Sequence, residues 1–215
     1  MKIGILGSGG VAQALGSGLA RHGHRVVLGT SSPAKLAAWA QGVPGASAAS
    51  FAEAAAGAEL VILAVKGSAA STVLQAAGAA ALAGKTVIDA TNPIADAAPV
   101  DGVLRYFTGP NESLMESLQQ AFPEARFVKA FNSVGSAHFI DPRFGGVRPT
   151  MFIAGNDDAA KAAVAALLDQ VGWETADMGS AVAARAIEPL AMLWCIPGFR
   201  QNQWAGRAFK LLRQA

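Results

Sequence analysis

The chain has 215 residues, of which 52% are hydrophobic and 15% are charged, a composition typical of a compact globular protein rather than a disordered one. The formal net charge is only +2 and no basic run occurs, which argues against a nucleic-acid-binding protein. A single cysteine excludes a disulfide within the chain.

The chain begins with an apolar segment that leads into a glycine-rich loop. Residues 3–6 predict a short buried strand, and residues 7–12 then match the pattern G-x-G-x-x-A, which opens a helix in dinucleotide-binding proteins. A phosphate at this point would meet the free N–H groups and the positive dipole end of that helix. The residues predicted to hold the pyrophosphate are Gly7, Ser8, Gly9, Gly10 and Val11.

The residues after the second predicted strand, 25–28, indicate which dinucleotide binds. NAD-binding proteins usually place an acidic residue about 20 residues beyond the glycine loop, where it holds ribose hydroxyls. No acidic residue precedes Glu53 in this chain. Hydroxyl and amino groups that favour the extra phosphate of NADP stand there instead: Thr30, Ser31, Ser32 and Lys35. The alternative is that Ser31 or Ser32 only caps the next helix, predicted over residues 33–41.

The remainder of the chain alternates strand and helix patterns. Strands are predicted over residues 46–49, 60–65, 86–91, 126–130, 150–155 and 173–177. Helices are predicted to start at Ser50, to follow Ser68 as far as about Leu82, and to span residues 113–121, 157–171 and 180–212, the last with a break at Pro197-Gly198. This rhythm predicts a Rossmann-type, doubly wound, mostly parallel α/β sheet. We expect a single domain over residues 1–215, with a C-terminal helical extension over about 180–215.

In such a sheet, ligands bind beyond the carboxyl ends of the strands. Lys66, Asn92 and Asn132 follow three different predicted strands, so we expect them to converge beside the glycine loop. The residues expected on the nicotinamide side of the site are Ala64, Val65, Lys66, Asn92, Pro93 and Asn132. Lys66, Asn132 and His138 are the candidates for a catalytic group, although His138 is equally well explained as a packing residue of its loop.

Other chemically active side chains have simpler structural explanations. His22 and His24 flank the turn before the second strand, opposite the expected ligand, and are predicted to lie at the surface. Arg185 and Glu188 have the spacing of an ion pair on a helix surface. Cys195 lies in an apolar stretch, which predicts a buried, unreactive thiol. No metal-ligand spacing occurs.

The segment 181–199 is the longest candidate for a membrane span, but it contains Arg185, Glu188 and Pro189, so we do not expect it to cross a membrane. The glycine loop interrupts the N-terminal apolar residues and argues against a signal peptide, which indicates a cytoplasmic protein. The large apolar side chains of residues 192–204 are expected to be core. A wall against a flat ring and a subunit interface, which would suit a homodimer, are the alternatives.

Segments spread over nearly the whole chain resemble the NADPH-dependent reductases of the deazaflavin coenzyme F420. They are the loop 7–12, Asp89-Ala-Thr-Asn-Pro93, Phe127-Val-Lys-Ala-Phe-Asn-Ser-Val-Gly135 and Arg185-Ala-Ile-Glu-Pro189. The oxidoreductase domain of the six-transmembrane metalloreductases is similar as well. The resemblance implies a single-domain protein that binds NADPH in an extended pose and passes hydride directly to a flavin-like ring system. Ser31 and Ser32 stand where those reductases commonly carry arginine, and Lys66 where many have a smaller or apolar residue.

These observations predict an NADP-dependent oxidoreductase that transfers hydride between NADP(H) and a planar electron acceptor, either F420 or a flavin. Transfer between two rings needs proximity and alignment more than acid–base groups, which fits a chain without an evident catalytic cluster. One alternative is a reductase of a small carbonyl or imine substrate, which would need a proton donor such as His138 or Lys66. The other is a non-catalytic NADP-binding sensor.

Overall fold

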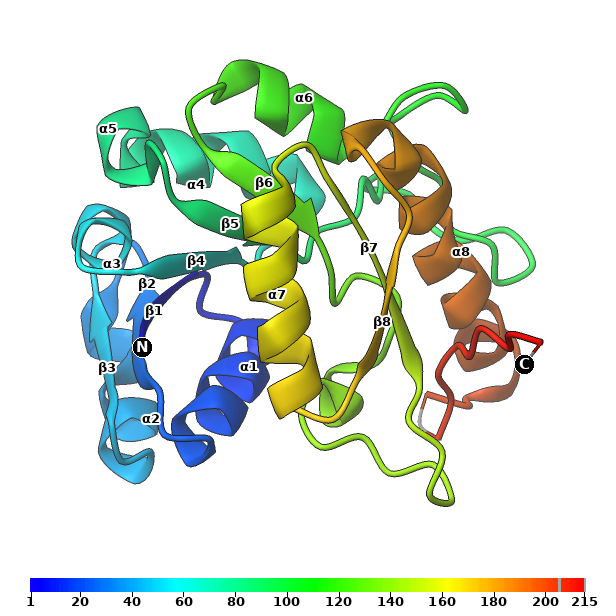
Figure 1. Ribbon diagram of the computed structural model, residues 1–215, viewed down its shortest axis with the longest axis horizontal. Helices are drawn as coiled ribbons and strands as arrows, with labels where there is room; N and C mark the ends of the chain where they lie inside the picture. Colours follow the sequence, from blue (N-terminus) through cyan, green and yellow to red (C-terminus); the bar gives the residue numbers. More distant parts are fainter. Residues whose placement is uncertain (205, 215) are drawn as a thin grey trace.

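The computed structural model describes residues 1–204 and 206–214, and in these residues eight strands form one sheet (Figure 1). The strands are β1 Lys2–Leu6, β2 Arg25–Gly29, β3 Ala46–Ala49, β4 Leu60–Leu63, β5 Thr86–Asp89, β6 Arg126–Lys129, β7 Thr150–Gly155 and β8 Glu174–Asp177. Their order across the sheet is β3-β2-β1-β4-β5-β6-β7-β8, and β6 with β7 is the antiparallel pair among otherwise parallel neighbours. The predicted Rossmann-type, mostly parallel sheet is confirmed.

Helices cover both faces of the sheet (Figure 1). The α-helices are α1 Gly10–Arg21, α2 Ala37–Gly42, α3 Phe51–Ala56, α4 Ala70–Ala77, α5 Ala79–Leu82, α6 Leu114–Ala121, α7 Asp158–Gln170 and α8 Ala184–Gln201. The short 3-10 helices are η1 Pro33–Leu36, η2 Gly67–Ala69, η3 Ser136–His138 and η4 Ala181–Ala183. The predicted helix 33–41 is therefore a 3-10 turn followed by α2. The helix starts predicted at Ser50 and Ser113 occur, because each serine hydroxyl accepts a backbone N–H three residues later.

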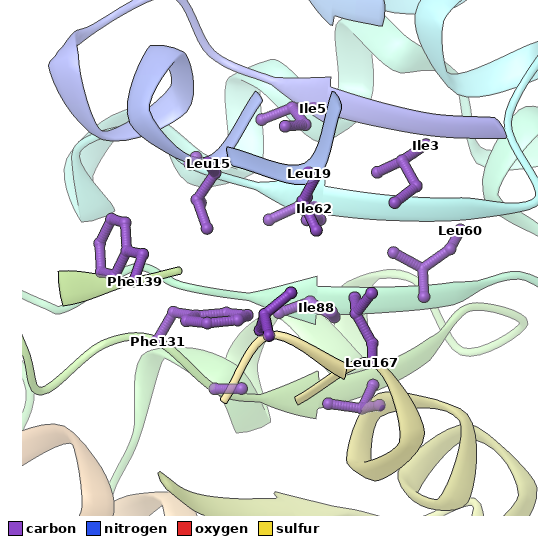
Figure 2. Close-up of a cluster of buried hydrophobic side chains, with 14 of the residues drawn as sticks. Ile3, Ile5, Leu15, Leu19, Leu60, Ile62, Ile88, Phe131, Phe139 and Leu167 are labelled. Carbon is purple, nitrogen blue, oxygen red and sulfur yellow. The ribbon is translucent and has the colours of Figure 1, made fainter. Parts of the chain in front are cut away.

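The central strands are buried on both sides because successive side chains point to opposite faces. On one face, Ile3 and Ile62 pack in one cluster with side chains of α1 and α7. Figure 2 shows Ile3 and Ile62 together with Leu15 of α1. On the other face, Leu63 and Val87 pack with α3, α4 and α6. Each fully buried side chain of this kind contributes about 1.5–3 kcal/mol. Burial on both faces explains the continuous apolar runs of these strands.

The C-terminal region departs from the prediction. Helix α8 continues through Pro197 to Gln201, so the predicted break at Pro197-Gly198 is wrong. Asn202 is its C-cap, with a φ of 54° in the left-handed region that often ends a helix. Residues 202–204 and 206–214 are not helical. A Cβ on Gly198 would lie 2.4 Å from the ring of Trp204, so the chain folds back closely over the end of the helix. The predicted helical extension is therefore correct only as far as Gln201.

The chain after α8 runs beside the start of β7. The N–H of Thr150 donates to the carbonyl of Phe209 at 2.8 Å, and the N–H of Leu211 donates to the Thr150 hydroxyl at 3.0 Å. These bonds satisfy backbone groups at the start of β7, and they compete directly with continuation of the helix.

Several large apolar side chains near the end of α8 are not core residues. Leu193, Phe199 and Trp204 are 56%, 45% and 41% exposed, so the expectation that residues 192–204 form core is wrong for them. Cys195 is half-buried, and burial raises the pKa of its thiol. By length and composition alone, the helical segment Ala181–Gln201 could cross a membrane.

One of the two N-terminal histidines is also placed differently from the prediction. His24 is buried rather than at the surface, because the end of α7 packs over it and its Nε2 lies 3.1 Å from Oε1 of Gln170. His22 is partly exposed and contacts the carboxylate of Asp141 at 3.0 Å.

Candidate functional site

The glycine loop lies between the end of β1 and the start of α1. Gly7 has φ +145°, and a Cβ there would lie 2.2 Å from the carbonyl oxygen of Ala64, so the fold itself requires glycine at this position. Gly9 has φ −76° and ψ 178°, which any residue adopts, and a Cβ on Gly9 or Gly10 would meet no atom within 4 Å. Neither packing nor backbone conformation explains these two glycines. Open space beside the first N–H groups of a helix is what a bound phosphate requires.

A cleft of about 590 Å³ opens at this loop, where the strand order reverses between β1 and β4. Its volume lies in the usual range for small-molecule sites. Its walls come from the loops that follow β1, β4 and β5. Of the predicted site residues, the cleft is lined by Ser8, Gly9, Gly10, Val11, Ala64, Val65, Lys66 and Asn92. A smaller cavity of about 360 Å³ lies at the opposite end of these strands, beside Lys2 and Arg25.

The residues predicted to bind the 2′-phosphate follow β2, the parallel neighbour of β1. Thr30 is buried, and its hydroxyl accepts the N–H of Ser32 at 3.2 Å. Ser31 and Lys35 are exposed. Ser32 precedes η1, but its hydroxyl makes no capping bond to that helix. The alternative in which Ser32 serves only as a helix cap is therefore not supported.

Asn92 and Asn132 meet beside the cleft, although they follow different strands. Nδ2 of Asn92 donates to the carbonyl of Asn132 at 2.8 Å. Nδ2 of Asn132 donates to Oδ1 of Asn92 at 3.1 Å and to the carbonyl of Ile187 at 3.0 Å. Asn92 lines the cleft, whereas Asn132 and Pro93 are buried. The structure thus brings the two asparagines together with the glycine loop at one edge of the sheet.

A buried ionic cluster, which the sequence analysis missed, adjoins the asparagines. Nζ of Lys129 lies 2.7 Å from Oδ2 of Asp89 and 2.8 Å from Oε1 of Glu188, and it donates to the carbonyl of Thr91 at 3.0 Å. The carboxylate of Glu188 also accepts the N–H groups of the first two residues of α6, each at 3.0 Å. Burial alone would lower the pKa of Lys129, but the two carboxylates outweigh this effect and hold the pKa above its ordinary value.

The predicted surface ion pair between Arg185 and Glu188 is therefore wrong. Arg185 pairs with Glu116 at 2.7 Å instead, while Glu188 is 1% exposed and bonded to Lys129. One signal could have indicated this arrangement. Asp89 and Lys129 each end an apolar strand of a sheet buried on both faces, where a charged group needs a charged partner.

The other candidates for a catalytic group differ in their position. Lys66 is exposed and lines the cleft, as does Asp96. His138 is not among the cleft-lining residues: its Nε2 accepts the N–H of Gly206 at 3.1 Å, and its ring centre lies 5.0 Å from that of Phe144. This favours the packing role for His138. Within residues 1–204 and 206–214, no group of three or more His, Cys, Asp or Glu side chains could hold a metal ion.

Comparisons with known proteins identify relatives of this chain by sequence and by fold. Residues 2–93 match the family model described as NADP oxidoreductase coenzyme F420-dependent. A candidate F420-dependent NADP-reductase from Arthrobacter sp. FB24 is 37% identical, with a TM-score of 0.91 over 99% of this chain and 100% of that one. An imine reductase from Streptomyces aurantiacus shares the fold at 19% identity, with a TM-score of 0.68 over 93% of this chain and 63% of that one.

Among curated proteins, the metalloreductase STEAP3 of Rattus norvegicus is 32% identical over 202 residues, which are 91% of this chain. The chain spans 38% of the length of that relative. The match at 37% identity over the full length of both chains, together with the family model, shows that this chain belongs to the family of coenzyme F420-dependent NADP oxidoreductases.

Proposed function

We propose that the protein is a cytoplasmic reductase that transfers hydride between NADP(H) and a planar electron acceptor, either F420 or a flavin. The observation that carries the proposal is the pair of glycines, Gly9 and Gly10, whose missing side chains leave open space at the start of α1. Packing does not require glycine at these positions, whereas a pyrophosphate needs the close approach to the backbone that they allow.

The cleft and the loop after β2, which does not line the cleft, suit different parts of NADPH. The first N–H groups of α1, a helix without an acidic residue in its first turn, would hold the pyrophosphate. Ser31, Ser32 and Lys35 would surround the 2′-phosphate, because they offer hydroxyl donors and a cation beside the end of β2. Val65 and Asn92 would face the nicotinamide, which supplies the hydride when NADPH is bound.

The remaining cleft surface suits a flat ring. Val11 and Ile94 line the cleft and are 40% and 37% exposed, so they offer apolar contact area that nothing else in the chain covers within the described residues. With F420 as acceptor, bound NADPH would supply the hydride, and solvent would supply the one proton that the reduced deazaflavin also needs. The protein's contribution is to hold the two rings in contact and keep water out.

A second candidate, reduction of a small carbonyl or imine, is favoured by one observation. Lys66 lines the cleft, and its amino group could donate the proton that such a substrate requires. Replacing Lys66 by methionine separates the candidates, since losing a proton donor costs about 100-fold or more in kcat. Ring-to-ring transfer should keep kcat within about threefold, because the side chain then affects only binding.

The decisive experiment measures NADPH oxidation against F420, FMN, FAD, a ferric chelate, a quinone and a cyclic imine. Turnover with F420 or a flavin, retained in the Lys66→Met variant, supports the proposal. Turnover with the imine alone, lost in that variant, supports the second candidate. NADPH that binds but is oxidised by no acceptor would contradict both and indicate an NADP-binding sensor.

A further inference from the structure

Three segments of the chain contact one another in two adjacent layers beside the cleft. The first, the ionic layer, is formed by the side chains of Asp89, Lys129 and Glu188. The second, the amide layer, is formed by the side chains of Asn92 and Asn132 and the carbonyl of Ile187. Each asparagine lies three residues after a member of the ionic layer, and Ile187 immediately precedes Glu188. The ionic layer is fully buried, whereas the amide layer reaches the cleft through Asn92.

Thr91 connects the two layers and is held by all of its polar groups. Its N–H and its hydroxyl donate to Oδ1 of Asp89 at 2.9 and 2.6 Å, and its carbonyl accepts Nζ of Lys129 at 3.0 Å. The ammonium group of Lys129 thus contacts the carboxylates of Asp89 and Glu188 as well as the carbonyl of Thr91. The backbone position of the next residue, Asn92, therefore depends on the ionic layer.

Close packing holds Asn92 from another side. A Cβ on Gly67 would lie only 2.0 Å from the carbonyl oxygen of Asn92, so η2 already contacts this backbone as closely as it can. With Gly67 on one side and the ionic layer on the other, a shift of Lys129 would be transmitted to the cleft wall, because packed interiors have little free space to absorb it.

The composition of the ionic layer is a poor solution for stability alone. Three ionisable side chains are packed together with almost no exposure to water, so all three lose the hydration that an ionic group has in solution. Well-packed apolar residues in place of buried ion pairs often leave stability unchanged or increase it. Hydrogen bonds of fixed direction are what apolar residues do not provide, and here they are directed at the residue that borders the cleft.

We propose that Lys129 is a positioning residue of the reductase: through Thr91 and the paired carboxylates it fixes Asn92 in the cleft wall, where the nicotinamide end of NADPH would bind. Lys129 itself is fully buried and does not line the cleft. The inference rests on the proposed function, because it assumes that NADPH occupies this cleft.

The test compares Lys129→Met, the neutral triple variant Asp89→Asn, Lys129→Met, Glu188→Gln, and the control Lys161→Met. Lys161 is a suitable control because it also pairs with two carboxylates, Asp158 at 3.1 Å and Asp177 at 2.9 Å, but lies on α7 away from the cleft lining. Thermal unfolding reports stability for each chain. Fluorescence titration gives the NADPH Kd, and steady-state kinetics separate kcat from KM.

We expect Lys129→Met to lower the unfolding temperature and to weaken NADPH binding and kcat by about tenfold each, because a misplaced contact costs rate as well as affinity. The triple variant should recover much of the unfolding temperature and keep both losses. Lys161→Met should leave Kd and kcat within about twofold of the wild type, since Lys161 pairs with Asp158 and Asp177, neither of which lines the cleft. If Lys129→Met does not fold, the triple variant alone decides.

A triple variant that regains both stability and wild-type kcat/KM would overturn the inference, since Lys129 would then be structural only. That result leaves the proposed function intact. A wild-type chain that does not bind NADPH would overturn the proposed function, and the inference with it. The wild-type titration therefore separates the two failures.

Discussion

Replacing Gly9 by alanine should weaken NADPH binding without unfolding the protein. The added Cβ meets no atom within 4 Å, and the backbone angles of Gly9 suit alanine. Alanine restricts the unfolded chain and so stabilises the fold by about 0.4–1 kcal/mol, whereas at a helix N-cap it is less favourable than glycine by a similar amount. The free energy of unfolding without ligand should therefore stay within about 1 kcal/mol of the wild type.

The cost for binding is larger because the same methyl group fills the space that a phosphate needs. Hydrogen bonds from the first N–H groups of α1 to a charged phosphate contribute about 1.5–3 kcal/mol each. Loss of one or two such bonds costs about 3 kcal/mol in total, and since about 1.4 kcal/mol is a tenfold change, the NADPH Kd should rise about 100-fold.

Calorimetric titration with NADPH and thermal unfolding without it measure the two effects separately. Gly7→Ala is the contrasting variant: its φ of +145° and the 2.2 Å approach to the Ala64 carbonyl predict a loss of stability even without ligand. A Gly9→Ala variant that binds NADPH within about threefold of the wild type would refute the assignment of the pyrophosphate to this loop.

Three other properties of the chain can be tested in the same way. The double variant Ser31→Ala, Lys35→Ala should raise KM for NADPH about tenfold and leave KM for NADH unchanged, because charge-assisted bonds to the 2′-phosphate, which only NADPH carries, are lost. Equal changes in both KM values would contradict the NADP assignment. Gly67→Ala should lower both NADPH affinity and the unfolding temperature, because the added Cβ would lie 2.0 Å from the carbonyl oxygen of Asn92. No change in either assay would show that the loop around Asn92 can shift without loss of stability or binding. Burial lowers the pKa of His24 in the folded chain, so the unfolded chain binds a proton at this imidazole more readily. The free energy of unfolding should therefore fall as the pH drops below 6.5, and denaturant unfolding should show a weaker pH dependence for His24→Leu.

The strands and the cleft could be predicted from the sequence because their signals are local or topological. The apolar run at residues 60–63 has no other simple explanation than a strand buried on both faces. The meeting of Asn92 with Asn132 follows from parallel topology, because the carboxyl ends of parallel strands share one edge of the sheet. Neither inference required knowledge of how the C-terminal helix packs.

The errors arose where contacts between distant segments outweigh local patterns. The spacing of Arg185 and Glu188 fits a surface pair, and nothing nearby in the sequence indicates that α8 lies against the ends of β5 and β6. The end of α8 is a second example. After the helix, the chain folds back over Gly198, and the contact that fixes this path is made by the ring of Trp204. In both places the local pattern is compatible with the structure and does not determine it.

Helix α8 carries one residue of a buried ion pair, Glu188, and one residue of a partly exposed ion pair, Arg185, so the contributions of the two pairs can be compared. Glu188→Ala leaves Lys129 without one of its carboxylates and exposes two N–H groups of α6, and breaking a buried pair of this kind costs about 3–5 kcal/mol. Arg185→Ala removes a partly exposed pair with Glu116, where the expected loss is about 0–1 kcal/mol. Urea unfolding followed by circular dichroism measures both. Equal, small losses would mean that Glu188 does not anchor α8 to the sheet. A large loss for Glu188→Ala alone would show that Lys129 and the two α6 N–H groups cannot remain buried without this carboxylate.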